Sequence, residues 1–375
     1  MPDVLNHILV TGGAGFIGSH TVDLLLSKGY KVRVLDNLEK QVHRGKKPDY
    51  LNEDAEYLFG DIRNISFWNK ALKGIDAVIH LAAMVGVGQS MYQPKRYLTT
   101  NTIGTANFFE VLLKQEKIRK NIKKIVVASS KSIYGEGAYY CKKDGIVYPP
   151  TRPKSQLKRG DWEVHCPVCG RHVVPVGITE DKPVQNLSIY ALSKYDTERT
   201  TLALASVLNI PAVAMRYFNV YGPRQSISNP YTGVLAIFLS RIKNNNPPII
   251  FEDGKQMRDF IYVEDVARAN LLAVEKEVEG AYNIGTGQPT SLINIISMLS
   301  EKLDTNVEPN ITHEFREGDN RHDFANISKA QKELGFRPKV DINKGLSKLV
   351  EWVETQEAED MFFKAEQERK RYFHQ

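Results

Sequence analysis

A glycine-rich loop between a strand and a helix constrains this chain more than any other feature. Residues 7–11 read His-Ile-Leu-Val-Thr, the pattern of a buried strand, and a loop with glycines at positions 12, 13, 15 and 18 follows directly. Such glycines allow a tight turn, a close approach of the backbone to a pyrophosphate, and packing of helix against strand. The pyrophosphate then lies at the positive end of the helix. The loop therefore predicts a dinucleotide site.

A carboxylate at the end of the next strand supports this prediction. The strand over residues 31–35 runs into Asp36, about the spacing expected for an acid that binds ribose. Asp36 would accept hydrogen bonds from a 2′-hydroxyl and repel a 2′-phosphate, which favours NAD over NADP. Residues 60–62, Gly-Asp-Ile, have the form of an adenine-binding turn in which Asp61 accepts from the base. Loop capping by Asp36 and a turn-forming role of Asp61 are the alternatives.

Short apolar runs recur along the chain and set the expected fold. They lie at residues 77–81, 125–128 and 212–215, and amphipathic stretches such as 105–114 separate them. This alternation predicts an α/β fold, a Rossmann-type doubly wound parallel sheet. We assign residues 1–215 to an NAD-binding domain and 216–353 to a smaller C-terminal α/β substrate domain, with parts of 216–285 returning to the first.

Two segments interrupt the alternation. Residues 136–183 are rich in Lys, Pro and Gly and hold all three cysteines, so we interpret them as an inserted, Cys-bearing subdomain. Residues 354–375 form a charged tail, expected to be an exposed helix that frays or docks.

Charge and composition narrow the choice of partners and location. The net charge is +6, and Lys and Arg are spread along the chain, so no nucleic-acid partner is expected. No apolar run approaches the ~20 residues of a membrane span. The chain enters its first strand almost at once after Met1, and three cysteines make no disulfide framework. We expect a cytoplasmic protein.

Tyr190 and Lys194 are the first candidates for chemistry. On a helix, residues four apart share one face. A nearby ammonium favours the phenolate and lowers the pKa of a tyrosine from its usual value of about 10. A tyrosine tuned in this way can take a proton from a substrate hydroxyl. Such a pair is also common on a solvated helix face, so its meaning depends on the rest of the chain.

The chain resembles the extended short-chain dehydrogenase/reductase family that acts on nucleotide sugars. The resemblance runs in order from about residue 7 to 350 and fails only across the insertion. It rests on residues 11–18, 36–37, 60–62, 80–83, 101, 129–130, 134–135, 190–194, 216–223, 258–263, 282–287 and 316–319.

The resemblance implies a role for each matching residue. It makes Tyr190 the catalytic acid/base, Lys194 the residue that lowers its pKa and holds the nicotinamide ribose, and Ser130 a partner of the reacting sugar oxygen. The implied cofactor residues are Gly12, Gly15, Phe16, Ile17, Gly18, Asp36, Asn37, Asp61, Ile62, Leu81, Ala82, Ala83, Asn101, Tyr190, Lys194 and Tyr217. The implied substrate residues are Val87, Ser130, Tyr190, Asn219, Ile250, Phe251, Arg258, Arg316 and Asp319. The family also implies a homodimer through the helices at 105–114 and 190–208.

The substrate implied by these residues is a nucleotide-diphosphate sugar. Asn219 would contact the diphosphate, and Arg258 and Arg316 would grip it with guanidinium forks. Ile250 and Phe251 would pack against the base. A turn role for Asn219 and surface ion pairs for the arginines are the alternatives.

The residues after Ser130 indicate which reaction to expect. Related 4,6-dehydratases carry Asp-Glu where this chain has Lys131-Ser132, and related decarboxylases carry Glu at the second position. Without these carboxyls, proton and hydride transfer remain, which indicates an NAD-dependent nucleotide-sugar 4-epimerase. The insertion makes the chain resemble dTDP-L-rhamnose 4-epimerases more than UDP-glucose 4-epimerases, and a UDP-glucose/UDP-GlcNAc-type 4-epimerase is the alternative. A nucleotide-sugar 4,6-dehydratase or reductase and a non-catalytic NAD-binding regulator are the competing hypotheses.

The insertion contains a candidate metal site. Residues 141–145 and 166–170 are two copies of a Cys-x2-ligand-Gly pattern, the second with the Cys-x2-Cys spacing of a zinc knuckle. Cys141, Cys166 and Cys169 could hold a structural zinc ion with Asp144 as the fourth ligand. His172 or His165 is the alternative fourth ligand. Three unpaired thiols, or a redox pair at Cys166 and Cys169, would explain the same residues without zinc.

Overall fold

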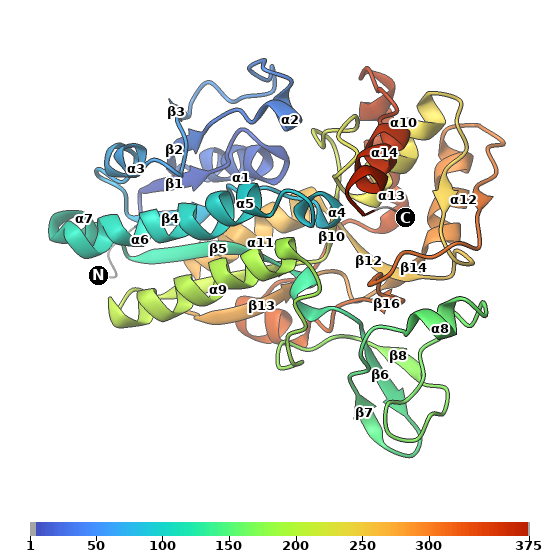
Figure 1. Cartoon of the computed structure of the whole chain (residues 1–375). Helices are drawn as coiled ribbons and strands as arrows, with labels where there is room; N and C mark the ends of the chain where they lie inside the picture. The colour runs from blue at the N-terminus through green and yellow to red at the C-terminus, as the bar shows by residue number, and fades with distance from the viewer. Residues whose placement is uncertain (1–4, 374–375) are drawn as a thin grey trace.

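A parallel seven-stranded sheet forms the core of the computed structural model, which describes residues 5–373 (Figure 1). Its strands are β1 (His7–Thr11), β2 (Lys31–Asp36), β3 (Glu56–Phe59), β4 (Ala77–His80), β5 (Lys124–Ser130), β9 (Ala212–Tyr217) and β13 (Gly280–Ile284). They lie in the order β13-β9-β5-β4-β1-β2-β3, and every neighbouring pair is parallel. This arrangement confirms the predicted Rossmann-type fold.

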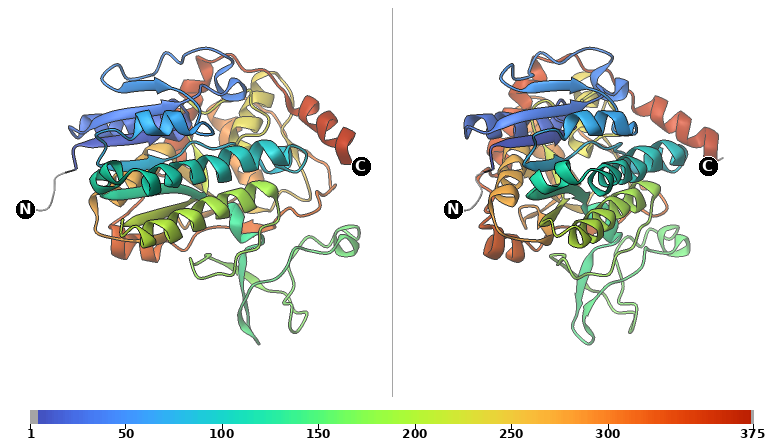
Figure 2. Two further views of the ribbon diagram at one scale, coloured as in Figure 1. Left: turned by 60° about the vertical axis from the view of Figure 1, so that its left-hand side comes forward. Right: turned by 90° about the vertical axis from the view of Figure 1, so that its left-hand side faces the viewer.

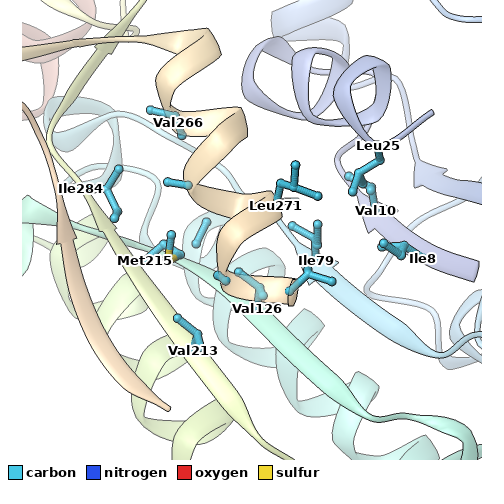
Figure 3. Close-up of a cluster of buried hydrophobic side chains, with 14 of the residues drawn as sticks. Ile8, Val10, Leu25, Ile79, Val126, Val213, Met215, Val266, Leu271 and Ile284 are labelled. Carbon is cyan, nitrogen blue, oxygen red and sulfur yellow. The ribbon is translucent and has the colours of Figure 1, made fainter. Parts of the chain in front are cut away.

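Helices cover both faces of this sheet because its strands alternate apolar side chains between the faces. Ile8 and Val10 point to the face where Val266 and Leu271 pack (Figure 3), whereas Leu9 belongs to the core on the opposite face. The first face is covered by α1 (Phe16–Ser27) and α11 (Val263–Glu275). The second is covered by α3 (Ile65–Ala71), α6 (Gly104–Lys114), α7 (Glu116–Asn121) and α9 (Ile189–Val207).

The C-terminal part of the chain builds a smaller α/β layer beside the sheet. It contains β10 (Asn219–Tyr221), β11 (Ile249–Ile250), β12 (Met257–Tyr262), β14 (Pro289–Ser291), β15 (Asn310–Ile311) and β16 (His322–Asp323). Its helices are α10 (Val234–Lys243), α12 (Leu292–Lys302) and α13 (Ile342–Glu354), which share one hydrophobic core. Helix α11 and strand β13 lie with the large sheet, although both belong to residues 216–285. The division into two domains, with parts of 216–285 returning to the first domain, stays a prediction.

The cysteine-bearing insertion projects from the body of the protein (Figures 1 and 2). It contains β6 (Ala138–Cys141), β7 (Gly145–Val147), β8 (Val174–Val176) and α8 (Lys154–Leu157), with the strands in the order β7-β6-β8. Tyr139, Cys141 and Cys166 belong to its small separate core. A buried ion pair of 2.8 Å between Arg152 and Glu252 attaches it to the C-terminal layer.

The described part of the charged tail docks on the protein. Helix α14 (Phe362–Phe373) lies near α10 (Figure 1), where Arg241 pairs with Asp360 at 3.0 Å. The Arg241 guanidinium lies 4.9 Å from the ring centre of Phe362.

The remaining short helices are α2 (Lys40–His43), α4 (Val87–Ser90), α5 (Pro94–Tyr97), η1 (Leu98–Ile103), η2 (Lys131–Tyr134) and η3 (Ala330–Leu334). Among residues 5–373, no helix combines the length and apolar character needed to cross a membrane. Residues 1–4 and 374–375, which the predicted first domain and tail include, lie outside the described range.

Candidate active site

A cavity of about 420 Å³ lies at the carboxyl ends of the central strands, where open α/β sheets bind their ligands. Most of the predicted cofactor residues and all three predicted catalytic residues line it, together with four of the predicted substrate residues. These are Gly12, Gly15, Phe16, Ile17, Gly18, Asp36, Asn37, Ile62, Leu81, Ala82, Ala83, Val87, Ser130, Tyr190, Lys194, Tyr217 and Asn219. The fold thus brings residues from eight separate segments of sequence around one space.

The glycine loop has no room for side chains at two of its positions. A Cβ atom at Gly18 would lie 2.0 Å from the carbonyl oxygen of Gly12, and one at Gly12 would lie 2.8 Å from the amide nitrogen of Ala82. Gly12 also has a φ of +71°, which glycine adopts most readily. Helix α1 begins after Gly15 with no side chain capping its free N–H groups. Those groups suit a pyrophosphate, so the loop fits a dinucleotide.

Asp36 is held in place at the end of β2 and faces the same cavity. Its Oδ2 accepts from the Ala14 N–H at 3.0 Å and its Oδ1 from the Leu38 N–H at 2.9 Å. Burial raises the pKa of Asp36, while those two hydrogen bonds oppose the change. Because an ionised carboxylate has about four acceptor positions, Asp36 keeps capacity to bind ribose hydroxyls.

The three predicted catalytic residues lie together beside the glycine loop. Tyr190 and Lys194 lie in the first turns of α9, which begins after Ser188, whose Oγ accepts from the Ala191 N–H at 3.1 Å. Ser130 ends β5 and lines the same cavity as Tyr190, and its hydroxyl accepts hydrogen bonds from the Ser132 N–H at 3.2 Å and the Ser132 hydroxyl at 3.0 Å. A serine and a tyrosine that line one cavity can both contact one substrate oxygen.

Burial dominates the electrostatics of this group. It raises the pKa of Tyr190, and the Ser130 hydroxyl lowers that pKa only in part. Burial also lowers the pKa of Lys194 to about 8, against the charge of Glu198. The expected net decrease in the pKa of Tyr190 is therefore wrong for this structure, because loss of solvent around the phenol outweighs any effect of the ammonium.

A buried polar network beneath the site was missed in the sequence. The Glu198 carboxylate accepts from the Ser129 hydroxyl at 2.6 Å and from two nitrogens of Arg216 at 3.0 and 2.6 Å. Arg216 also donates to the Tyr134 hydroxyl at 2.7 Å. The network joins α9 to β5 and β9 directly behind Ser130 and Lys194. The sequence does contain a pattern that indicates part of this network, since Glu198 follows Lys194 by four residues and so shares its helix face.

Two predicted cofactor residues do not line the cavity. The Asn101 amide accepts from the Met84 N–H at 2.7 Å and donates to Ser193 at 2.9 Å, so it holds the cavity wall from behind. Asp61 pairs with Arg63 at 2.5 Å in the turn after β3. Asp61 thus makes the contacts of a turn-forming residue, as its second interpretation predicts.

A second, larger cavity of about 1450 Å³ adjoins the first. Val87, Lys131, Tyr231 and Thr232 line both, so the two spaces are neighbours. Arg316 and Asp319 line the second cavity, as do residues of α8 and α14. Sequence reasoning missed Tyr231 and Thr232, which carry no motif, and considered Lys131 only as a position without a carboxyl.

The remaining predicted substrate residues have protein partners. The Arg258 guanidinium donates to the carbonyls of Met257, Arg321 and Asn320 at 2.9 to 3.0 Å and lines neither cavity. Ile250 and Phe251 also line neither, although the Phe251 ring lies 4.0 Å below the Arg316 guanidinium. Asn219 differs from these, because its Oδ1 atom is buried at the first cavity without a hydrogen-bond partner.

The insertion brings four potential metal ligands together. The ligand atoms of Cys141, Asp144, Cys166 and Cys169 all lie within 4.8 Å of one another. The Asp144 Oδ2 lies 3.3 Å from the Cys141 Sγ and 3.2 Å from the Cys166 Sγ. The two histidines considered as the fourth ligand lie outside this group, since the His165 Nε2 bonds Asp161 at 3.0 Å and His172 packs beside His165.

The fold and the site together define a Rossmann-type protein in which a tyrosine, a lysine and a glycine loop line one cavity. The chain belongs to the NAD dependent epimerase/dehydratase family, whose model matches residues 8–157 and 169–285. It is 34% identical over 354 residues to a dTDP-L-rhamnose 4-epimerase of Burkholderia thailandensis, covering 92% of this chain and 94% of the relative.

The chain is also similar to solved structures of nucleotide-sugar 4-epimerases. A UDP-glucose 4-epimerase of Thermotoga maritima with UDP-glucose has a TM-score of 0.74 and 33% identity, covering 93% of this chain and 98% of that one. A Thermus thermophilus UDP-glucose 4-epimerase in complex with NAD has a TM-score of 0.74 and 28% identity, covering 94% and 100%.

Proposed function

We propose that this protein is an NAD-dependent nucleotide-sugar 4-epimerase. The observation that carries the proposal is that Ser130, Tyr190 and Lys194 line one cavity suited to a dinucleotide, which adjoins a larger second cavity. The family match and relatives named as 4-epimerases support it. Lys131 and Ser132 provide no carboxyl for dehydration or decarboxylation next to this pair.

The residues suggest how C4 would be inverted. Tyr190 would take the proton of the 4-hydroxyl, Ser130 would hold the same oxygen, and Lys194 would hold the nicotinamide ribose and favour the phenolate. The glycine loop and Asp36 would hold NAD, which would supply the hydride acceptor and donor for C4. Tyr190 would then return the proton after the 4-keto sugar has presented its opposite face.

A screen of nucleotide sugars would identify the substrate. We propose dTDP-L-rhamnose as the first candidate, because the insertion resembles that group and one relative carries that activity in its name. UDP-glucose and UDP-N-acetylglucosamine are the second candidates. Product stereochemistry by NMR should show inversion at C4 only. A 4-keto-6-deoxy product would indicate a dehydratase, and binding of NAD and nucleotide sugar without turnover would indicate a regulator.

We propose a structural zinc site in the insertion, with Cys141, Asp144, Cys166 and Cys169 as ligands. Three thiols and a carboxylate within 4.8 Å suit tetrahedral Zn²⁺. Metal analysis should find near-stoichiometric zinc in the wild type and in His172→Ala, but much less in Asp144→Ala. Metal-free protein with three titratable thiols would refute the proposal, and loss of metal in His172→Ala would reassign the fourth ligand.

We propose a homodimer through α6 and α9, and a cytoplasmic location in keeping with three free cysteines. Exposed apolar side chains on or next to these helices support the dimer, including Ile103, Leu113 and Val207. Val207→Glu should shift the mass in solution from dimer to monomer. Val168→Glu in the insertion is the matched control, because both valines are 72% exposed. A monomeric wild type would refute the dimer.

A further inference from the structure

A carboxylate from the C-terminal helix lies between two arginines at the second cavity. The Glu366 Oε1 atom lies 2.5 Å from Arg316 Nη2, and its Oε2 atom lies 3.1 Å from Arg369 Nε. All three residues line the second cavity. The Arg316 Nε atom is buried and has no hydrogen-bond partner, so this guanidinium has an unused donor.

Two contacts C-terminal to Glu366 hold helix α14, and with it this carboxylate, against the protein. Glu368 accepts a hydrogen bond of 2.5 Å from the Tyr231 hydroxyl, and Tyr231 lines both cavities. The Tyr372 ring stacks on the Tyr92 ring at 5.0 Å. The helix therefore forms a wall of the second cavity, at the edge of the body seen in Figure 2.

The arrangement matches that of a bound anion. Arginine forks pair with carboxylates and phosphates in the same planar, bidentate way, so a carboxylate between two guanidiniums marks a place where a phosphate fits. We propose that Arg316 and Arg369 together bind the diphosphate of the nucleotide sugar, and that Glu366 occupies this place until the substrate displaces it. The inference rests on the proposed function, because that function supplies a diphosphate substrate.

Two roles of Glu366, competition with the substrate and a purely structural role, predict opposite changes in the affinity for nucleoside diphosphates. If Glu366 competes with the substrate, its removal frees both arginines, and Glu366→Gln should bind dTDP and UDP about three- to tenfold more tightly. If Glu366 only fixes α14, the same variant should bind them more weakly or equally. Arg369→Ala should weaken binding about tenfold or more, with a smaller loss in Arg369→Lys.

The test is calorimetric titration of the full-length, NAD-loaded protein with dTDP and with UDP. Arg371→Ala is the matched control for Arg369→Ala, because Arg371 is an exposed neighbour that does not line the cavity. Glu357→Gln is the control for Glu366→Gln, because Glu357 is exposed in the same tail. Both controls should bind like the wild type, and thermal melting would confirm that every variant is folded.

A background that lacks both arginines shows whether Glu366 acts through them. In an Arg316→Ala, Arg369→Ala background, Glu366→Gln should no longer tighten binding. Wild-type binding with no gain in Glu366→Gln would overturn this inference and leave the proposed function intact. Absence of binding to any nucleoside diphosphate in the wild type would overturn the proposed function and the inference with it.

Discussion

Lys194 carries a stability cost that can be estimated from its environment. Burial lowers its pKa from 10.5 to about 8, so the folded protein binds the proton less tightly than the unfolded chain does. A difference of about 2.5 pKa units corresponds to about 3 kcal/mol at neutral pH. Lys194→Met keeps the length of the side chain and removes the charge. We expect it to raise the free energy of unfolding by up to about 3 kcal/mol while abolishing turnover.

The way in which the stability difference between Lys194→Met and the wild type changes with pH distinguishes this explanation from better packing alone. Between pH 8 and 10.5 the unfolded chain holds the Lys194 proton and the folded protein does not, so wild-type stability rises with pH through this window relative to the variant. The advantage of Lys194→Met should therefore fall from about 3 kcal/mol at pH 7 to about 1.5 kcal/mol at pH 9.5. A gain from packing would not change with pH.

Urea unfolding of the dinucleotide-free protein at these two pH values is the assay, because the pKa applies to the free site. Arg199→Met on the same helix is the control, since Arg199 is exposed and its loss should change stability by no more than about 0.5 kcal/mol at either pH. A variant less stable than the wild type at neutral pH, or a difference that does not shrink with pH, would refute the reasoning.

Three further variants test the site and its support. Tyr190→Phe should lose about 10²- to 10⁴-fold in turnover with NAD still bound, and unimpaired turnover would remove Tyr190 from the mechanism. Glu198→Gln should destabilise the protein by about 3 kcal/mol or more in urea unfolding, because it leaves the buried guanidinium of Arg216 without its charge partner. The exposed Glu110→Gln should change stability little, and equal effects of the two would contradict this explanation. Gly18→Ala should prevent NAD binding or folding, since its Cβ would lie 2.0 Å from the Gly12 carbonyl; normal NAD affinity would show that the loop can shift.

The parts of the site that the sequence predicted are those that local patterns define. The glycine loop, Asp36 and the Tyr190–Lys194 spacing each depend on one strand–turn–helix unit or one helix, so their neighbours in sequence are their neighbours in space. The structure accordingly places them around one cavity.

Residues whose partners lie far along the chain could not be placed in this way. Arg258 was expected to grip a diphosphate, but carbonyls of Asn320 and Arg321, more than sixty residues away, take its donors. The direction of the Tyr190 pKa depends on burial, which spacing on a helix does not report. The docking of α14 likewise depends on contacts across more than a hundred residues, such as that between Arg241 and Asp360.

The position of the two cavities relative to the family match explains why the reaction is easier to infer than the substrate. Ser130, Tyr190 and Lys194 lie inside the matched residues 8–157 and 169–285, together with the loop that would hold NAD. Arg316, Glu366 and Arg369 lie beyond them, and Lys158 and Trp162 of the insertion fall in the gap between them, yet all five line the second cavity. Under the proposed function, the matched segments hold the residues for proton and hydride transfer, while segments outside the match form part of the lining of the second cavity. Exchanging residues 154–162 or the tail with those of a UDP-glucose 4-epimerase should consequently change substrate affinity more than the rate of the chemical step.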